Sequence, residues 1–264
     1  MNLLFWNLHN HENSLYIEKL LDEHNIDIAL FSEHKNFKLD FIKKPHSNYK
    51  IIPAMGACEK ILSLCKTNIN IKTRREQTRY AIYTFTAHET LIILVGLHLE
   101  SNPYSGSDAR KTTISELMFD LNALEKENHS GKTIIIGDFN ASPFDSELVQ
   151  KNMFNAVLFK ELLRKCEFDT YNGKKYRRFY NPMLDYITES VQRYGSFHYT
   201  ADINSLHWYC FDQVLLRKNL MDRLISLDYC KSIGNKSILT KDGYPNSKIS
   251  DHLPLLVEVD LDGK

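Results

Sequence analysis

A carboxylate and a carboxamide follow directly on a strongly apolar run near the middle of the sequence. The run from Thr133 to Ile136 is rich in β-branched residues, which is typical of a buried strand. Asp138 and Asn140 then stand two positions apart, where that strand must end. One interpretation is a turn in which each side chain bonds its own backbone. The other interpretation is that the two side chains bind a ligand or another functional group.

The same placement recurs at the ends of other apolar runs. Asp212 interrupts one of them, where burial of a carboxylate is costly unless it has a hydrogen-bond donor or a cation. Taken singly, the other positions have ordinary structural interpretations, such as a strand-edge amide, an exposed carboxylate, a core histidine or a loop cap. These positions are Asn7, Glu33, His98, Asp251 and His252.

Taken together, the polar residues predict a site for a divalent cation. The carboxylates of Glu33, Asp138 and Asp251, with the amide oxygens of Asn7 and Asn140, form a hard, oxygen-rich set. Such a set suits Mg²⁺ or Mn²⁺, whereas zinc sites contain more Cys or His. Mg²⁺ keeps several waters in its coordination shell. We therefore expect only part of the set to touch the metal.

Two histidines and a further aspartate complete the apparatus for hydrolysis of a phosphate ester. The transition state of that reaction carries charge on phosphate oxygens, which cations and imidazolium groups stabilise. A carboxylate beside a histidine fixes the tautomer of the ring and raises its basicity. We predict that Asp212 and His252 form such a pair, and that His98 lies close by.

Periodicity predicts the elements that must position these residues. A stretch that is aromatic and polar, from 169 to 207, predicts surface loops. The predicted helices span 15–24, 108–128 and 155–166. The predicted strands span 3–8, 26–34, 50–52, 60–64, 79–85, 90–100, 133–136, 177–182, 208–216, 224–230 and 253–261.

The order of these elements predicts an α/β fold. Strands come mostly in pairs and helices are inserted singly, which favours two packed sheets flanked by helices over a regular βαβ winding. No low-complexity linker, proline-rich run or internal repeat divides the chain. We therefore expect a single domain over residues 1–264.

Composition limits the classes of function. Lys and Arg total 33, as do Asp and Glu, so no overall charge attracts polyanions and any contact with nucleic acid must be local. The five cysteines are scattered and odd in number, which indicates reduced thiols. The first residues lack the basic region of a signal peptide, and no stretch approaches the roughly 20 apolar residues of a membrane span. We expect a soluble cytoplasmic protein; its oligomeric state stays open.

Six short segments, in this order over nearly the whole chain, resemble the endonuclease/exonuclease/phosphatase superfamily. They are "FWN", "SEH", "GLHLES", "GDFN", "FDQVLL" and "SDHLP". The resemblance implies a four-layer α/β-sandwich in which two packed, mostly antiparallel sheets are flanked by helices. It also implies a metal-dependent phosphodiester hydrolase that uses Mg²⁺ or Mn²⁺.

The resemblance further implies a role for each matching residue. Asn7 and Glu33 would bind the cation with help from Asp251. Asp138 and Asn140 would orient or deprotonate the attacking water and bind the phosphate. Asp212 would orient His252, which would contact the scissile phosphate. His98 would stabilise the transition state or act as a general acid. Whether Asp138 or His252 takes the proton from water stays open.

One segment outside these motifs could contact a nucleic acid. Residues 172–182 interleave cations with aromatic rings, on which bases stack at about 1–3 kcal/mol each. The alternative is a solvated basic hairpin whose rings pack on the sheet. The candidate substrate-binding residues are Lys175, Arg177, Arg178 and Tyr180.

Three functions are compatible with the sequence. The first is a nuclease or nucleotidyl phosphodiesterase, with nucleic acid or a nucleotide as the substrate. The second is a phosphatase or phosphodiesterase acting on a phospholipid or a small phosphorylated metabolite. The third is a catalytically silent binding domain, which predicts loss of at least one motif residue, and none of them is lost.

Overall fold

Two large sheets contain most of the predicted strands. The computed structural model describes residues 1–188, 195–201 and 206–261. The six-stranded sheet has the order β16 (Leu224–Tyr229), β19 (Leu255–Val259), β1 (Asn2–Asn7), β2 (Ile28–Ser32), β4 (Leu62–Lys66) and β3 (Tyr49–Ile51). The seven-stranded sheet has the order β5 (Ile71–Gln77), β6 (Tyr80–Ala87), β7 (Thr90–His98), β8 (Thr133–Asp138), β15 (Asp212–Leu216), β12 (Phe179–Tyr180) and β9 (Ala156–Val157).

Most neighbouring strands in both sheets are antiparallel. The parallel pairs are β1 with β2, β7 with β8, and β12 with β9. In the first two pairs, the carboxyl ends of two strands lie side by side, and the predicted polar residues lie at or just beyond those ends. The parallel pairs therefore gather residues that are distant along the chain.

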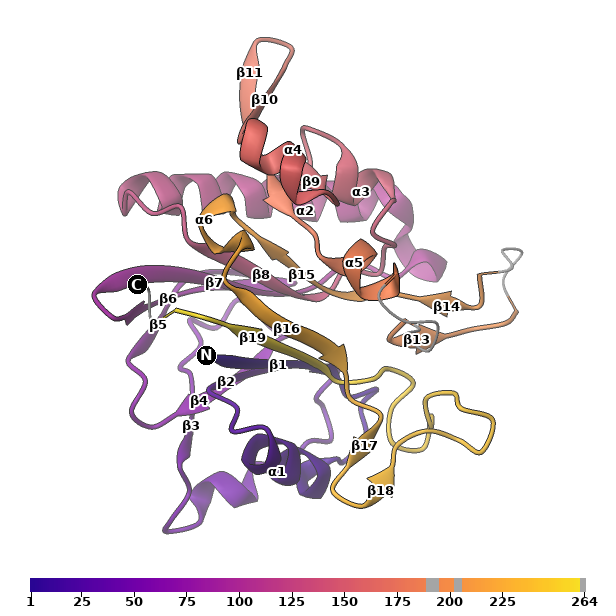
Figure 1. Ribbon diagram of the computed structural model, residues 1–264. Helices are drawn as coiled ribbons and strands as arrows, with labels where there is room; N and C mark the ends of the chain where they lie inside the picture. Colours follow the sequence, from indigo (N-terminus) through magenta and orange to yellow (C-terminus); the bar gives the residue numbers. More distant parts are fainter. Residues whose placement is uncertain (189–194, 202–205, 262–264) are drawn as a thin grey trace.

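The sheets pack face to face, with helices on both outer sides (Figure 1). On β8, Ile134 and Ile136 belong to the core between the sheets, while Ile135 packs with the helical layer outside. Both faces of this strand are covered, which explains its unbroken apolar run. The helix α2 (Asn102–Glu127) covers the seven-stranded sheet through Ile114, Leu117, Leu121 and Leu124. The helix α1 (Ser14–Glu23) covers the other sheet. The predicted four-layer sandwich is confirmed.

Short elements complete the chain. They are η1 (Asp40–Lys43), α3 (Ser146–Val149), α4 (Lys160–Lys165), α5 (Met183–Thr188), α6 (Lys218–Met221), and the two-stranded pairs β10 (Phe168–Tyr171) with β11 (Lys174–Arg177), β13 (Phe197–His198) with β14 (Trp208–Tyr209), and β17 (Ser232–Ile233) with β18 (Lys236–Ser237). None of the helices in the described part of the chain combines the length and apolarity that a bilayer crossing requires.

Two predicted elements need correction, and one strand was missed. The helix predicted over 155–166 is only α4, because Asn155 adopts a left-handed backbone and Ala156–Val157 pairs with β12. The stretch predicted as loops, 169–207, contains strands and α5, which pack through long-range contacts that a local pattern does not report; its residues 189–194 and 202–205 lie outside the described residues. The strand β5 went unpredicted because its side chains alternate weakly between buried and exposed.

Candidate active site

Three of the predicted residues stand in a row across the seven-stranded sheet. His98 ends β7, Asp138 ends β8, and Asp212 begins β15. In the pairing registers, His98 is opposite Asp138, and Asp138 is opposite Asp212. The sheet alone therefore brings a histidine and two carboxylates together from strands that are far apart in the sequence.

Asn7 joins this row to the six-stranded sheet. It ends β1 and is buried, and its Nδ2 donates hydrogen bonds to Asp138 Oδ2 at 3.1 Å and to Glu33 Oε1 at 3.3 Å. Its Oδ1 accepts a hydrogen bond from the backbone N–H of His9 at 3.0 Å. These partners fix the orientation of the amide. Asn7 therefore presents N–H groups to the carboxylates in this arrangement, and it positions them; its role as a metal ligand stays a prediction.

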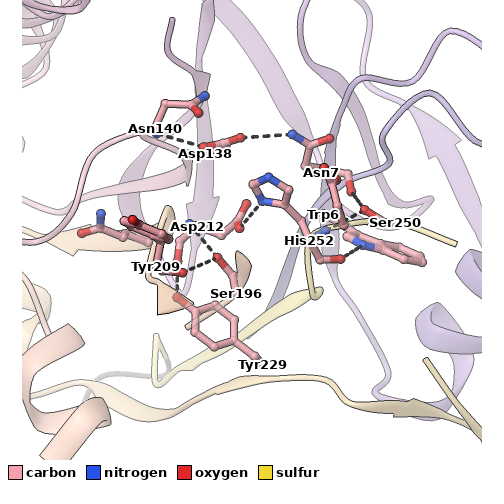
Figure 2. Close-up of polar contacts among 12 residues, drawn as sticks. Trp6, Asn7, Asp138, Asn140, Ser196, Tyr209, Asp212, Tyr229, Ser250 and His252 are labelled. Carbon is pink, nitrogen blue, oxygen red and sulfur yellow. Dashed lines mark hydrogen bonds and ion pairs between the residues drawn. The ribbon is translucent and has the colours of Figure 1, made fainter. Parts of the chain in front are cut away.

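Asp212 and His252 form the predicted pair (Figure 2). The Nδ1 atom of His252 lies 2.7 Å from Asp212 Oδ2, and both side chains are buried. The backbone of His252 is held on two sides, because Trp6 Nε1 donates to its carbonyl at 2.9 Å and its N–H donates to Ser250 Oγ at 3.0 Å. The pair therefore has a fixed geometry.

The two members of this pair share one proton. Burial raises the pKa of Asp212 by disfavouring its charged form. Burial also acts to lower the pKa of His252, but the neighbouring carboxylates of Asp212 and Asp138 outweigh it, so that the pKa of His252 is raised. A proton on Nδ1 satisfies both groups. Asp212 Oδ1 has no hydrogen-bond partner among the described residues.

Asp138 and Asn140 form the turn that one interpretation of the sequence predicted. Asp138 Oδ1 accepts the backbone N–H of Asn140 at 2.9 Å, and Asn140 Nδ2 donates to the carbonyl of Leu99 at 2.9 Å. Asn140 has a left-handed backbone with φ of 46°. The turn fixes Asp138 while its Oδ2 faces Asn7 (Figure 2), so the structural and the functional interpretation describe one arrangement.

His98 faces two carboxylates without bonding either. Its Nε2 lies 3.7 Å from Asp138 Oδ2 and 3.8 Å from Glu33 Oε1, and its buried Nδ1 has no hydrogen-bond partner among the described residues. Burial lowers the pKa of His98, against the opposing effect of Asp138 and Glu33. The ring is thus favoured in its neutral form, which carries one donor and one acceptor nitrogen.

A third histidine near the site was missed. His9 Nδ1 lies 3.2 Å from Asp251 Oδ1 and 3.9 Å from Glu33 Oε2. Glu33 and Asp251 therefore converge on the same ring, as expected of two residues that serve one cation. The signal was present in the sequence, because His9 follows Asn7 by two positions at the end of the first strand.

The donor set fits a divalent cation. Asp251 Oδ1 is buried and accepts no hydrogen bond from any described residue, and Glu33 has a left-handed backbone with φ of 47° that turns the chain at the end of β2. Asp138, Asp212 and His252 also place one ligand atom each within 4.8 Å of one another. Two of these groups, His252 and Asp212, already contact each other at 2.7 Å, however. Glu33 and Asp251 therefore stay the predicted ligands.

The four candidate substrate-binding residues lie elsewhere. Asp212 begins β15, while Tyr180 pairs with Leu216 at the other end of that strand. Arg178 makes a double ion pair with Asp169, at 2.6 Å and 2.8 Å. These positions could not be predicted from composition, because the pairing of β12 with β15 decides them.

The remaining members of that set also have structural partners. Arg177 pairs with Glu167 at 2.6 Å, and Tyr180 is fully buried with its hydroxyl bonded to Asp185. Lys175 is exposed on the β10–β11 hairpin, which projects from the outer helical layer (Figure 1). The interpretation as a basic hairpin with packed rings therefore describes this segment best.

Aromatic rings that the sequence analysis did not select flank His252 instead. The ring of Phe197 lies 4.9 Å from that of His252, and it stacks on Phe211 at 5.5 Å. Tyr199 follows the end of β13, stacks on Phe197 at 6.3 Å and is about half exposed. The predicted loop region thus contributes aromatic surface beside the catalytic candidates.

Residues 4–252 match the model of the Endonuclease/Exonuclease/phosphatase family. A comparison with curated protein sequences returned no match. Solved structures share the fold at low identity. Truncated Caenorhabditis elegans TDP2 is 14% identical with a TM-score of 0.60, over 97% of this chain and 95% of that one. The endonuclease domain of TRAS1, a telomere-specific non-LTR retrotransposon, is 12% identical with a TM-score of 0.57, over 99% of both chains. The 3′ phosphatase NExo from Neisseria, bound to a product DNA hairpin, is 12% identical with a TM-score of 0.55, over 98% of this chain and 99% of that one.

Proposed function

This chain belongs to the endonuclease/exonuclease/phosphatase family, and from that premise we propose that it is a Mg²⁺- or Mn²⁺-dependent phosphoesterase that hydrolyses phosphodiester bonds in nucleic acid. The single observation that carries the proposal is the buried pair of Asp212 and His252, set beside the carboxylates of Asp138 and Glu33. A histidine ring and several carboxylates lie close together there, at the ends of strands from both sheets.

His252 and His98 have pKa values shifted in opposite directions, and we assign their roles from this difference. The raised pKa of His252 keeps its ring positive, so it donates to and stabilises the negative phosphate in the transition state. The lowered pKa of His98 keeps that ring neutral, so it serves as a hydrogen-bond donor to a phosphate oxygen. A positive ring cannot accept a proton from water.

Asp138 is therefore the better general base. Its two oxygens are held by the N–H groups of Asn140 and Asn7, which fix the carboxylate near His98. The cation, held by Glu33 and Asp251, would supply positive charge to the phosphate and to the attacking water. Asn7 and Asn140 act by positioning Asp138, and Asp212 acts by holding His252.

Nucleic acid is the preferred substrate class for two reasons. The solved structures of this fold include an endonuclease domain and a 3′ phosphatase with a DNA hairpin. The ring of Phe197 lies beside His252, and the half-exposed Tyr199 stacks on Phe197, so these rings offer surfaces on which a base can stack. The alternative substrates, a phospholipid or a small phosphorylated metabolite, are separated from this proposal by experiment.

Turnover should be measured with Mg²⁺, with Mn²⁺ and with EDTA, on single- and double-stranded DNA, on RNA and on bis(p-nitrophenyl) phosphate. We expect metal-dependent cleavage that falls at least about 10²-fold in His252→Ala, a typical contribution of an acid–base residue. Lys175→Ala is the matched control, because Lys175 lies on the projecting hairpin; it should keep full activity.

Two outcomes would contradict the proposal. Near-normal turnover in His252→Ala would refute the assigned role of that ring. Release of inorganic phosphate from lipid or sugar phosphates, without cleavage of any polymer, would favour the alternative substrate class.

A further inference from the structure

His9 stands where the two carboxylates assigned to the cation meet. Its Nδ1 is 3.2 Å from Asp251 Oδ1 and 3.9 Å from Glu33 Oε2. We infer that His9 supplies a nitrogen ligand to the cation held by Glu33 and Asp251. The inference rests on the proposed metal dependence, and it adds a donor that the sequence motifs do not contain.

The backbone holds His9 in this position. Its φ of 48° is left-handed, which is uncommon for a residue other than glycine. Its N–H donates to Asn7 Oδ1 at 3.0 Å, and the following residue, Asn10, donates its N–H to the carbonyl of Glu33 at 2.8 Å. The turn after β1 is therefore tied to the turn after β2, and the ring projects between the carboxylates because of those two bonds.

The contact between His9 and Asp251 is close but is not a hydrogen bond. Asp251 Oδ1 is buried and has no hydrogen-bond partner among the described residues, although Nδ1 lies within 3.2 Å of it. No hydrogen bond to Nδ1 of His9 is formed within the described part of the chain either. An imidazole nitrogen and a carboxylate oxygen thus approach each other outside hydrogen-bonding geometry, and a cation beside them would accept a lone pair from each.

A nitrogen donor changes which metal the site prefers. Mg²⁺ strongly prefers oxygen ligands, whereas imidazole suits transition metals. Replacing one oxygen by a histidine nitrogen therefore shifts the balance from Mg²⁺ toward Mn²⁺ and its neighbours in the first row. The donor set of Glu33, Asp251 and His9 predicts a site that binds Mn²⁺ more tightly than Mg²⁺.

Pulsed EPR of the full chain loaded with Mn²⁺ tests the ligation directly and needs no substrate. A directly bound imidazole gives a ¹⁴N hyperfine coupling to Mn²⁺. We expect this coupling in the wild-type protein, its loss in His9→Asn, and its retention in His11→Asn. His11 is the matched control, because its ring lies 5.4 Å from that of His9 while its Nε2 is engaged by the carbonyl of Ser247.

Equilibrium titrations with Mn²⁺ and Mg²⁺ provide the second measurement. His9→Asn should weaken Mn²⁺ binding at least about tenfold, since loss of an outer-shell partner alone has an effect of that size. Mg²⁺ binding should change much less. Circular dichroism establishes that the variant is folded, and His9→Gln serves as a second variant if it is not.

The outcomes separate this inference from the proposed function. Mn²⁺ bound without ¹⁴N coupling, or coupling that persists in His9→Asn, would overturn the inference and leave the proposed function standing. Coupling that depends on His9, in a protein that cleaves no phosphate ester, would support the metal site and overturn the function. Failure of the wild-type protein to bind Mn²⁺ would contradict both.

Discussion

Two buried histidines of one site, His98 and His252, have pKa values that their surroundings shift in opposite directions. His252 touches Asp212 at 2.7 Å, and this carboxylate with Asp138 raises its pKa. His98 reaches its nearest carboxylates only at 3.7 Å and 3.8 Å, so burial prevails and lowers its pKa. A separation of pKa values within one site marks a division between charged and neutral roles.

The substitution Asp212→Asn tests whether the carboxylate of Asp212 keeps His252 charged. The amide cannot balance an imidazolium, so the pKa of His252 should fall and turnover should drop at least about 10²-fold. The measurement is an NMR titration of the histidine rings, together with the dependence of rate on pH. Asp169→Asn, which removes the partner of Arg178, is the control and should leave both unchanged.

The sign of the pH effect on stability follows from the raised pKa of His252. In the wild-type protein, the charged ring contributes to the free energy of unfolding below its ordinary pKa, and that contribution is lost as the pH rises through the raised pKa. Asp212→Asn should remove this loss. A variant whose stability still declines over the same pH window would show that another group is responsible.

At the level of elements, a single glycine sets the distance between β7 and β8 beside the site. A Cβ atom on Gly137 would lie 2.1 Å from the carbonyl oxygen of Leu97, far inside van der Waals contact. The backbones can approach this closely only because Gly137 has no side chain. Asp138 is the next residue, so the glycine also decides where that carboxylate stands.

Gly137→Ala should destabilise the protein by at least about 2 kcal/mol, because backbone must move to admit the methyl group. Chemical denaturation measures the loss, and activity at permissive temperature should fall as Asp138 shifts. The control is Gly131→Ala, where the obstructing atoms are the side-chain ends of Arg177 and Asn219. Those ends can rotate away, so we expect a change within about 1 kcal/mol. Equal losses in both variants would refute the close-approach argument.

At the level of the whole molecule, a buried ion network anchors the end of the seven-stranded sheet that lies away from the site. Arg217 is fully buried, its Nε lies 2.8 Å from Glu125 Oε1, and its guanidinium sits 3.7 Å above the ring of Phe179. It also donates to the carbonyls of Arg177 and Arg178. The network thus joins α2, β15 and the segment that leads into β12.

Glu125→Gln should cost about 3–5 kcal/mol, because it leaves the charge of Arg217 buried without its partner. Thermal and denaturant unfolding measure the loss, and the activity of the folded fraction should be unchanged, since the network lies at the far end of β15. Glu127→Gln is the control, because its pair with Arg75 is exposed and should contribute about 0–1 kcal/mol. A Glu125→Gln protein as stable as this control would show that the network contributes little.

The sequence by itself determined the sandwich and selected most of the candidate site residues that the structure brings together. Strands with two covered faces are continuous apolar runs, so a polar residue at the end of such a run is conspicuous without any structure, as with Asp138 after Ile136. The pairing of Asp212 with His252 was also predictable, because a buried carboxylate requires a partner.

Only the tertiary structure decided the remaining features. The amide of Asn7 faces the carboxylates with its nitrogen, because a backbone bond from His9 holds its oxygen. Arg177 and Arg178 belong to the far end of β15, because strand order sets that distance. His9 reaches Glu33 and Asp251 through two linked turns. The local sequence pattern indicates which residues are buried, because burial follows from each residue's own polarity. The direction of a side chain and its distance from other site residues depend instead on which distant strands become neighbours.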